Sequence, residues 1–161
     1  KQNTNSIEAW ESDYLFVAPS LLPHAGNGLF TAIAIYKDEV ISIFEGELLT
    51  SMQAKLRANK GHDKYFISLL NGTTMDSMHT PCFAKYANDA EGFAKSKFKN
   101  SAKITLDEED KVCIVATRNI KVSEEIFCAY GKAYWKLHGW WIRRQNIITQ
   151  YYFSFIVLHT W

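Results

Sequence analysis

The chain has 161 residues, 47% hydrophobic and 14% aromatic, which is enough for one domain with a single buried core. A formal net charge of +1 gives no overall field that would favour nucleic acid or a membrane surface as the partner. Three cysteines (Cys82, Cys113 and Cys128) without a C-x-x-C pair argue against a disulfide scaffold and a structural zinc site. Residues 1–13 are polar and lack a signal-peptide core, so we expect an intracellular protein.

The N-terminal part predicts short strands separated by turns. Residues 1–13 are expected to be a lead-in, and the β-prone residues 14–17 to form a strand that stops at Pro19. A proline and two glycines predict a loop over residues 20–28. Further strands are predicted by apolar and β-branched residues at 29–35, 40–44 and 48–50.

The central part predicts one helix and two hairpins. A helix is expected over residues 52–58, with Thr50 or Ser51 as its N-cap. Asn71-Gly72 between apolar runs predicts a hairpin with a two-residue turn. The remaining expectations are an irregular stretch at 79–92, a hairpin of 103–106 with 112–117, a last strand at 126–130 and a helix at 132–144. Many short strands and few helices predict a mostly β fold.

The C-terminal residues 147–161 are apolar but too short to span a bilayer, and Gln150 and Ser154 interrupt them. A strand or helix packed on the core is the favoured interpretation. A partner-binding or dimerising segment is the first alternative, and a membrane role is the second. The five histidines have no metal-like spacing, so no metal site is predicted. The run of lysines between 85 and 103 is interpreted as a solvated face, with contact to an acidic tail or nucleic acid as the alternative.

Six short segments carry the most specific signal in the chain. They are GNGLF (26–30), IFEGE (43–47), YFI (65–67), KYANDA (85–90), KNSAK (99–103) and SEEIFCAYG (123–131). In this order they resemble motifs of the SET-domain family, the catalytic fold of many protein lysine methyltransferases. The matching motifs are its glycine-rich turn, its Y-x-G-E strand end, its aromatic channel strand, R-F-x-N-H-S, the P-N segment after it, and G-E-E-L-x-x-x-Y-G.

The resemblance implies a mostly β SET-domain fold with short helices, in which the Asn88 and Tyr130 segments meet in the family's pseudoknot. It divides the chain into the lead-in 1–13, a SET domain at 14–131 and an aromatic extension at 132–161. The zinc-binding segment that follows some SET domains is absent from this sequence. Four residues depart from the family pattern. Asp89 stands where histidine is usual, Ala90 where serine is usual, Ser123 where glycine is common, and Phe44 where many members have tyrosine.

The resemblance also implies the site residues. Tyr130 would be the catalytic residue, with its hydroxyl where methyl donor and amine meet. Aromatic residues would line the channel for the substrate lysine: Phe44, Phe66 and, favoured by strand alternation, Tyr65. The cofactor S-adenosylmethionine would be bound by residues from several segments: Gly26, Asn27, Gly28, Leu29, Asn88, Asp89, Tyr130 and Trp135. Glu124 and Glu125 are expected to stabilise a turn or pair with a basic group.

The implied function is methyl transfer from S-adenosylmethionine to a lysine of a protein substrate, with histone tails as the default and with no direct nucleic acid or membrane partner. A nuclear location is favoured over a cytoplasmic one. Two other functions are kept open. Asp89 and Phe44 would suit a SET-like binding module with little catalysis, and the aromatic C-terminus would suit an unrelated small β domain that binds a partner.

Overall fold

The computed structural model describes residues 6–92, 96–132 and 154–157, with side chains for the first two ranges. The chain forms two compact units, and each is assembled from two separate stretches. Unit 1 comprises Lys1–Phe44 and Phe83–Ala129, and unit 2 comprises Glu45–Cys82 and Tyr130–Trp161. Among the described residues, short strands predominate and the helices are few and short, which confirms the predicted mostly β fold.

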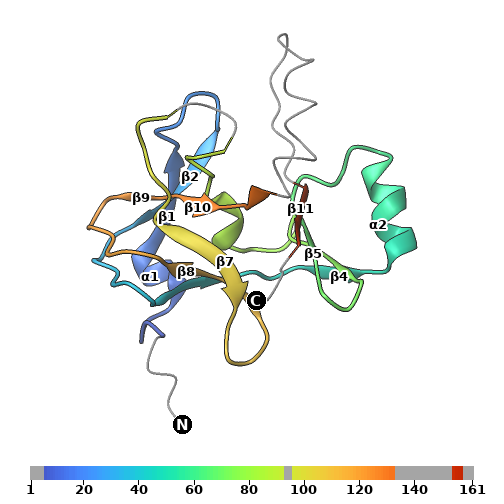
Figure 1. Ribbon diagram of the computed structural model, residues 1–161, viewed down its shortest axis with the longest axis horizontal. Helices are drawn as coiled ribbons and strands as arrows, with labels where there is room; N and C mark the ends of the chain where they lie inside the picture. The colour runs from blue at the N-terminus through green and yellow to red at the C-terminus, as the bar shows by residue number, and fades with distance from the viewer. Residues whose placement is uncertain (1–5, 93–95, 133–153, 158–161) are drawn as a thin grey trace. The chain divides into compact units, whose positions relative to one another are not determined.

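Unit 1 contains two sheets, a short helix α1 (Glu11–Tyr14) and a 3-10 helix η1 (Ala84–Tyr86) (Figure 1). The first sheet has the order β1-β2-β9 and the second has the order β10-β7-β8-β3. Their strands are β1 (Leu15–Pro19), β2 (Asn27–Thr31), β3 (Val40–Ile43), β7 (Ala102–Leu106), β8 (Val112–Ala116), β9 (Glu125–Ile126) and β10 (Cys128–Ala129).

The core of unit 1 is made of aliphatic side chains from these strands and from the turns between them. The fully buried aliphatic residues are Leu29, Ile35, Ile41, Ile114, Ile120 and Ile126. At about 25 cal/mol per Å² of apolar area removed from water, such side chains supply the main stabilisation of the unit. Helix α1 joins this unit through Glu11, whose carboxylate accepts hydrogen bonds from Ser42 Oγ at 2.7 Å and Ile43 N at 2.8 Å.

The segment predicted as one strand at 126–130 is split between the two sheets. β9 pairs with β2 in the first sheet, and β10 pairs in parallel with β7 in the second (Figure 1). The change occurs at Phe127, whose carbonyl accepts hydrogen bonds from Ser101 N at 2.8 Å and Ala102 N at 2.9 Å. Because these donors come from a distant part of the chain, local strand propensity does not reveal the break.

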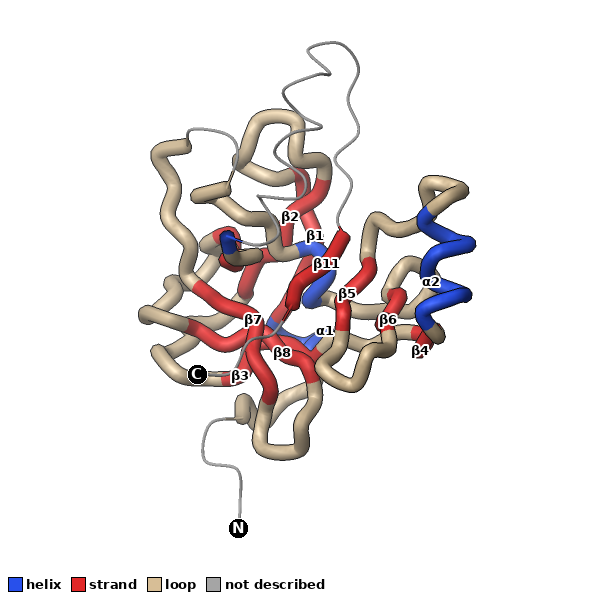
Figure 2. Tube along the Cα trace, turned by 45° about the vertical axis from the view of Figure 1, so that its right-hand side comes forward, coloured by secondary structure: helices blue, strands red, loops and turns tan. Residues whose placement is uncertain are grey.

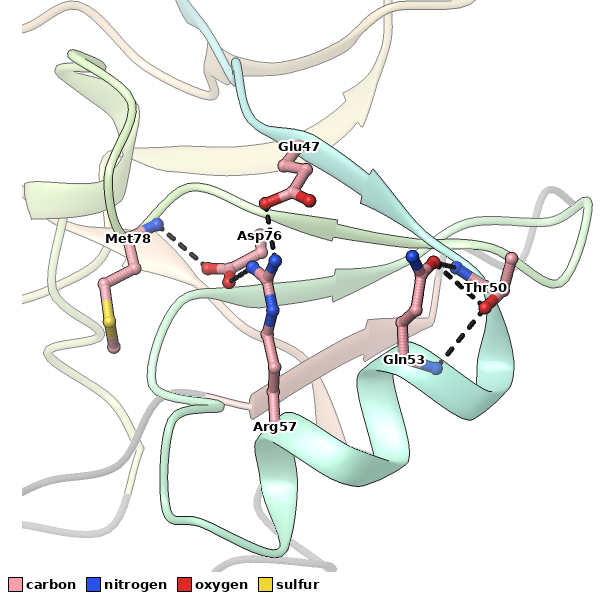
Figure 3. Close-up of polar contacts among 6 residues, drawn as sticks. All are labelled: Glu47, Thr50, Gln53, Arg57, Asp76 and Met78. Atoms are coloured by element: carbon pink, nitrogen blue, oxygen red, sulfur yellow. Dashed lines mark hydrogen bonds and ion pairs between the residues drawn. The ribbon is translucent and has the colours of Figure 1, made fainter.

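Unit 2 contains a sheet of order β11-β5-β6-β4 and the helix α2 (Ser51–Ala58), which lies alongside these strands in Figure 2. The strands are β4 (Glu47–Leu49), β5 (Phe66–Ser68), β6 (Thr74–Asp76) and β11 (Ser154–Val157). Thr50 is the N-cap of α2, as predicted, and forms a capping box with Gln53 (Figure 3). The small core of the unit brings together Leu49, Ala54 and Phe66.

The hairpin of β5 and β6 is confirmed, but its turn is not the predicted two-residue type. Leu69 N bonds to Thr73 O and Gly72 N bonds to Leu69 O, which leaves a three-residue turn with Gly72 at φ 81°. Asn71 does not adopt positive φ. Its Oδ1 instead accepts hydrogen bonds from Thr73 N at 3.0 Å and Thr73 Oγ1 at 2.6 Å, a local side-chain turn that competes with the expected one.

An ionic contact attaches α2 to the sheet of unit 2 (Figure 3). The guanidinium of Arg57 donates to Glu47 Oε2 at 2.6 Å on β4 and to Asp76 Oδ2 at 2.7 Å on β6. Asp76 is buried, and its other oxygen accepts a hydrogen bond from Met78 N at 3.0 Å. The hydrogen bonds that its guanidinium donates to Glu47 and Asp76 raise the pKa of Arg57. The contact therefore satisfies a carboxylate that would otherwise be buried without a cation.

Part of the C-terminal segment completes this sheet. Ser154–Val157 forms β11 and pairs in parallel with β5, with Ser154 opposite Phe66 and Val157 opposite Ser68. This strand fits the favoured interpretation of residues 147–161, whereas the helix predicted up to residue 144 lies, from residue 133 on, outside the described residues. Across the described part of the chain, the helices are too short or too polar to cross a membrane.

Candidate functional site

The glycine-rich segment forms the start of β2 and the loop before it. Ser20 N donates to Gly26 O at 2.8 Å and closes this loop, and Gly26 itself has φ 71°. Gly26 and Asn27 are exposed, whereas Gly28 and Leu29 are buried. Leu29 lies opposite Val17 on one side and Ile126 on the other, in the middle of the sheet. The exposed part of this segment is therefore the turn at residues 26 and 27.

Asn88 lies directly after η1 and is only 5% exposed. Its carbonyl accepts a hydrogen bond from Cys128 N at 2.8 Å, which joins it to the start of β10. Its side-chain Nδ2 donates to Asn27 O at 3.0 Å and lies 3.5 Å from Glu125 Oε1. The structure therefore brings together, within unit 1, three of the segments singled out in the sequence: the glycine-rich turn, the Asn88 segment and the Glu125 segment.

Asp89 stabilises a turn. Its Oδ1 accepts hydrogen bonds from Asn100 Nδ2 at 2.8 Å and Glu91 N at 2.9 Å, and Asn100 Oδ1 accepts one from Ala90 N at 2.9 Å. Glu91 in turn binds Lys99 Nζ and Asn100 N, both at 3.0 Å. The hydrogen bond from Lys99 lowers the pKa of Glu91. These contacts connect the Asn88 segment to the KNSAK segment at 99–103.

Glu125 has a carboxylate inside unit 1, with only 1% of the residue exposed. Oε1 accepts a hydrogen bond from Ser20 Oγ at 2.6 Å, and Oε2 accepts one from Leu21 N at 2.6 Å. With Asn88 Nδ2 nearby, three neutral donors surround this charge, as burial of a carboxylate requires. The neighbouring Glu124 behaves differently, since it binds Arg118 Nη2 at 2.6 Å.

One atom of the Asn88 amide, Oδ1, accepts no hydrogen bond from the described residues. The contacts of this side chain within the described ranges all involve Nδ2. The turn that Nδ2 contacts is accessible, and a Cβ added to Gly26 would meet no atom within 4 Å. A carbonyl oxygen beside an exposed turn suits the ammonium group of an amino acid. These residues therefore fit the amino-acid part of S-adenosylmethionine.

The residues predicted to line a substrate channel belong to both units. Phe44 follows β3 in unit 1, is 8% exposed, and donates its N–H to Val112 O at 2.8 Å. Tyr65 and Phe66 belong to unit 2. Phe66 is 2% exposed and packs in the core of that unit, whereas Tyr65 is half-buried with Lys64 Nζ 5.1 Å from its ring centre. Of these two residues, Tyr65 is therefore the better placed to contact a ligand.

Tyr130 directly follows β10 and is buried, with 8% exposure. Gly131 comes next with φ 87°, so the strand ends in the glycine turn that the sequence predicted. Trp135, the remaining residue predicted to bind the cofactor, lies outside the described residues. The roles of Tyr130, Phe44, Tyr65 and Phe66 stay predictions, as do those of Gly26, Asn27, Gly28, Leu29, Asn88, Asp89 and Trp135.

The thiols and acidic side chains offer little other chemistry. Burial raises the pKa of the Cys128 thiol well above its ordinary value, and Asp89 and Cys113 act in the same direction. Burial also raises the pKa of Cys113, to about 11. Such thiols are neutral at physiological pH and are poor nucleophiles. Within the described ranges, no three His, Cys, Asp or Glu residues are grouped so that they could hold a metal ion.

Two residues of this region had no assigned role in the site from sequence. Glu125 was expected only to stabilise a turn or to pair with a basic group, and Ser20 was treated as part of a plain loop. No local pattern marks Glu125 as buried, since a glutamate next to a strand is usually exposed. Its partners, Ser20 and Leu21, lie more than 100 residues away in sequence and have no such pattern either.

Comparison with known proteins agrees with this arrangement. The family model described as SET domain matches residues 26–131. Similar solved structures include an active polycomb repressive complex 2 in the basal state (TM-score 0.62, covering 73% of this chain) and in the stimulated state (0.64, 74%). A humanised mutant of the Chaetomium thermophilum complex bound to an inhibitor is a third (0.59, 73%).

In all three structures the identity is 24%, and the match covers 15% of the other chain. At this identity the likeness to solved structures shows the fold, and the chain corresponds to a small part of those longer proteins. The family model covers about two thirds of the present chain, including the glycine-rich turn and the segments of Asn88, Glu125 and Tyr130. The chain belongs to the SET-domain family.

Proposed function

We propose that this protein is an S-adenosylmethionine-dependent protein-lysine N-methyltransferase. The observation that carries the proposal is the hydrogen bond of 3.0 Å from Asn88 Nδ2 to Asn27 O. It joins the two segments that the SET-domain resemblance assigns to cofactor binding. Membership of a family that includes many lysine methyltransferases supports the same reaction. The solved relatives belong to a polycomb repressive complex, so a nuclear location and a histone tail as substrate are the favoured choices.

The cofactor would supply a methyl group on a positively charged sulfur. The role of this protein is to bind and align the methyl donor and the amine, because methyl transfer to an amine needs little acid–base chemistry once the amine is neutral. Asn88 Oδ1 would accept a hydrogen bond from the ammonium of the cofactor, with the turn at Gly26 and Asn27 beside it. Holding two reactants in line can remove several kcal/mol, up to about 10, from the barrier.

The substrate lysine has to lose its proton before it reacts. Apolar and aromatic walls favour the neutral amine, because burial disfavours the charged form. The SET-domain resemblance assigns these walls to Phe44 and Tyr65, and it assigns the orientation of the neutral nitrogen to the hydroxyl of Tyr130. The burial of Phe66 in the core of unit 2 favours Tyr65, the residue directly before β5, as the aromatic residue that contacts the substrate.

Calorimetry with S-adenosylmethionine and S-adenosylhomocysteine tests the cofactor site. We expect the wild-type chain to bind with about micromolar affinity, and Asn88→Ala to weaken binding at least tenfold, since a hydrogen bond to a charged group contributes about 1.5–3 kcal/mol. Asn119→Ala is the matched control, because Asn119 Oδ1 only accepts from Lys37 N on an exposed loop. Absence of binding by the wild type, or equal binding by both asparagine variants, would contradict the proposal.

A SET-like module that binds a peptide without efficient transfer is the second candidate. The observation in its favour is Asp89, which stands in place of the usual histidine and whose carboxylate binds Asn100 at 2.8 Å. The two functions are separated by incubating the protein with a radiolabelled methyl donor and a panel of lysine peptides. Transfer to any lysine supports the enzyme, whereas cofactor binding without transfer to any peptide or extract protein supports the module.

Phe44→Tyr is expected to shift the product distribution towards fewer methyl groups. Phe44 is buried at the end of β3, and a tyrosine there would add one hydroxyl near the target nitrogen in the proposed channel. The hydroxyl would narrow the space and bind the amine, so that a second or third methyl is accommodated less easily. Mass spectrometry of the methylated peptide measures the distribution, and an unchanged distribution would remove Phe44 from the channel.

A further inference from the structure

The buried carboxylate of Glu125 contacts three separate parts of unit 1. It binds the loop before β2 through Ser20 Oγ and Leu21 N, both at 2.6 Å, and it lies 3.5 Å from Asn88 Nδ2. The same Nδ2 donates to Asn27 O. Because Nδ2 carries two hydrogens, one directed to Asn27 and the other towards Glu125, the amide is held in the orientation that directs Oδ1 away from both acceptors.

The space beside this carboxylate explains the glycine at position 28. A Cβ added to Gly28 would collide with Glu125 Oε1 and would lie 2.7 Å from Cδ of the same side chain. Both atoms within 3 Å of this Cβ belong to Glu125, and Gly28 does not have a positive φ. The side chain of Glu125 therefore excludes an alanine at position 28, and backbone strain plays no part in this.

We propose that Glu125 is a positioning residue of the cofactor site, which orients the amide of Asn88 and fixes the loop at residues 20 and 21, with Gly28 providing the space for its carboxylate. The inference rests on the proposed function, since it assigns a role within the same site. Glu125 does not contact the reacting atoms in this assignment. It acts through Asn88, and the loss of its charge or length should affect cofactor affinity more than the rate of transfer.

Substitution of the two adjacent glutamates tests the assignment. Glu125→Gln keeps the size of the side chain but replaces one acceptor oxygen by an amide NH2 group. Either Ser20 Oγ or Leu21 N then loses its acceptor, and the other keeps only a neutral one. We expect the dissociation constant and the KM for S-adenosylmethionine to rise about tenfold, with kcat at saturating cofactor within about twofold of wild type. Glu124→Gln is the matched control and should leave all three values unchanged, because Glu124 binds Arg118 and Lys121 N.

A double-mutant cycle tests the pairing of Gly28 with Glu125. Gly28→Ala should weaken cofactor binding at least tenfold, because the new methyl group displaces the carboxylate. Glu125→Asp withdraws the carboxylate by one methylene and should weaken binding by itself. In the combined variant the methyl group fills the space that the shorter side chain leaves, so binding should be no weaker than in Gly28→Ala alone. Independent sites would instead multiply the two losses.

The possible outcomes separate failure of the proposed function from failure of the role assigned to Glu125. If the wild type fails to bind the cofactor, the proposed function fails and this inference fails with it. If the wild type binds but folded Glu125→Gln has unchanged affinity, or the cycle shows multiplied losses, the inference alone is wrong. Where Glu125→Gln does not fold, Ser20→Ala decides, since it removes only one hydrogen bond to the carboxylate from a half-buried position. It should raise the dissociation constant about threefold, and an unchanged value would overturn the assignment.

Discussion

Tyr130→Phe is expected to slow methyl transfer about 100-fold, with cofactor affinity within about twofold of wild type. Phenylalanine keeps the ring, which is buried at the end of β10, and removes only the hydroxyl. In the proposed reaction this hydroxyl orients the amine in the transition state, so its loss should lower kcat and leave cofactor binding intact. Single-turnover transfer to a peptide, with calorimetry on the same preparation, measures both quantities.

Tyr14→Phe provides the matched control for this experiment. Tyr14 is also buried, but its hydroxyl donates to Ile41 O at 2.8 Å within the core, and burial raises its pKa. Loss of that hydroxyl should cost about 1 kcal/mol of stability and leave the transfer rate unchanged. If Tyr130→Phe retains the wild-type rate, or if both variants slow transfer equally, Tyr130 is a core residue and has no part in catalysis.

Gly46→Ala is expected to destabilise the protein by about 3 kcal/mol. A Cβ on Gly46 would lie 2.5 Å from Asp76 O and 2.7 Å from Asp76 C, in the backbone of the strand that pairs with β4. Backbone atoms cannot rotate away as a flexible side chain can, so β4 and β6 have to separate. Thermal unfolding followed by circular dichroism should show the melting temperature lowered by roughly 5–10 °C.

Gly72→Ala separates this steric effect from the general cost of replacing a glycine. Gly72 has φ 81° in the turn between β5 and β6, and a Cβ there would meet nothing within 4 Å. Its replacement should therefore cost only the left-handed backbone strain, about 1 kcal/mol. If Gly46→Ala and Gly72→Ala lower the stability equally, the backbone around Asp76 can move away from the new Cβ at little cost, and the expected steric effect is absent.

Elements with strong local signals were predicted well from sequence. The cap at Thr50 and the turn around Asp107 are examples, since each is determined by side chains within a few residues of the backbone groups they bind. The predicted two-residue turn at Asn71-Gly72 was wrong. The side chain of Asn71 accepts a hydrogen bond from Thr73 N and stabilises a different local turn of similar energy. The family motifs also predicted the order of the segments and a mostly β fold.

Contacts between residues far apart in the chain could not be predicted from the sequence. The switch of sheets at Phe127 depends on Ser101 and Ala102, and Glu125 was not expected to hold Ser20 and Leu21 because nothing near them in sequence indicates the pairing. The same limit applies to Asn88, which local rules interpret as a turn asparagine. Its contact with Asn27, 61 residues away, is what makes it a candidate cofactor ligand.

The construction of each unit from two separate stretches has a consequence for the nascent chain. As residues leave the ribosome, β3 emerges long before β8, the neighbour that covers its edge, and β5 emerges long before β11. During synthesis these strands expose unpaired backbone groups, a situation that favours association between chains and slows folding. Neither unit can close until the second of its two stretches has been made, so the edges of β3 and β5 that face β8 and β11 have to remain unpaired until then.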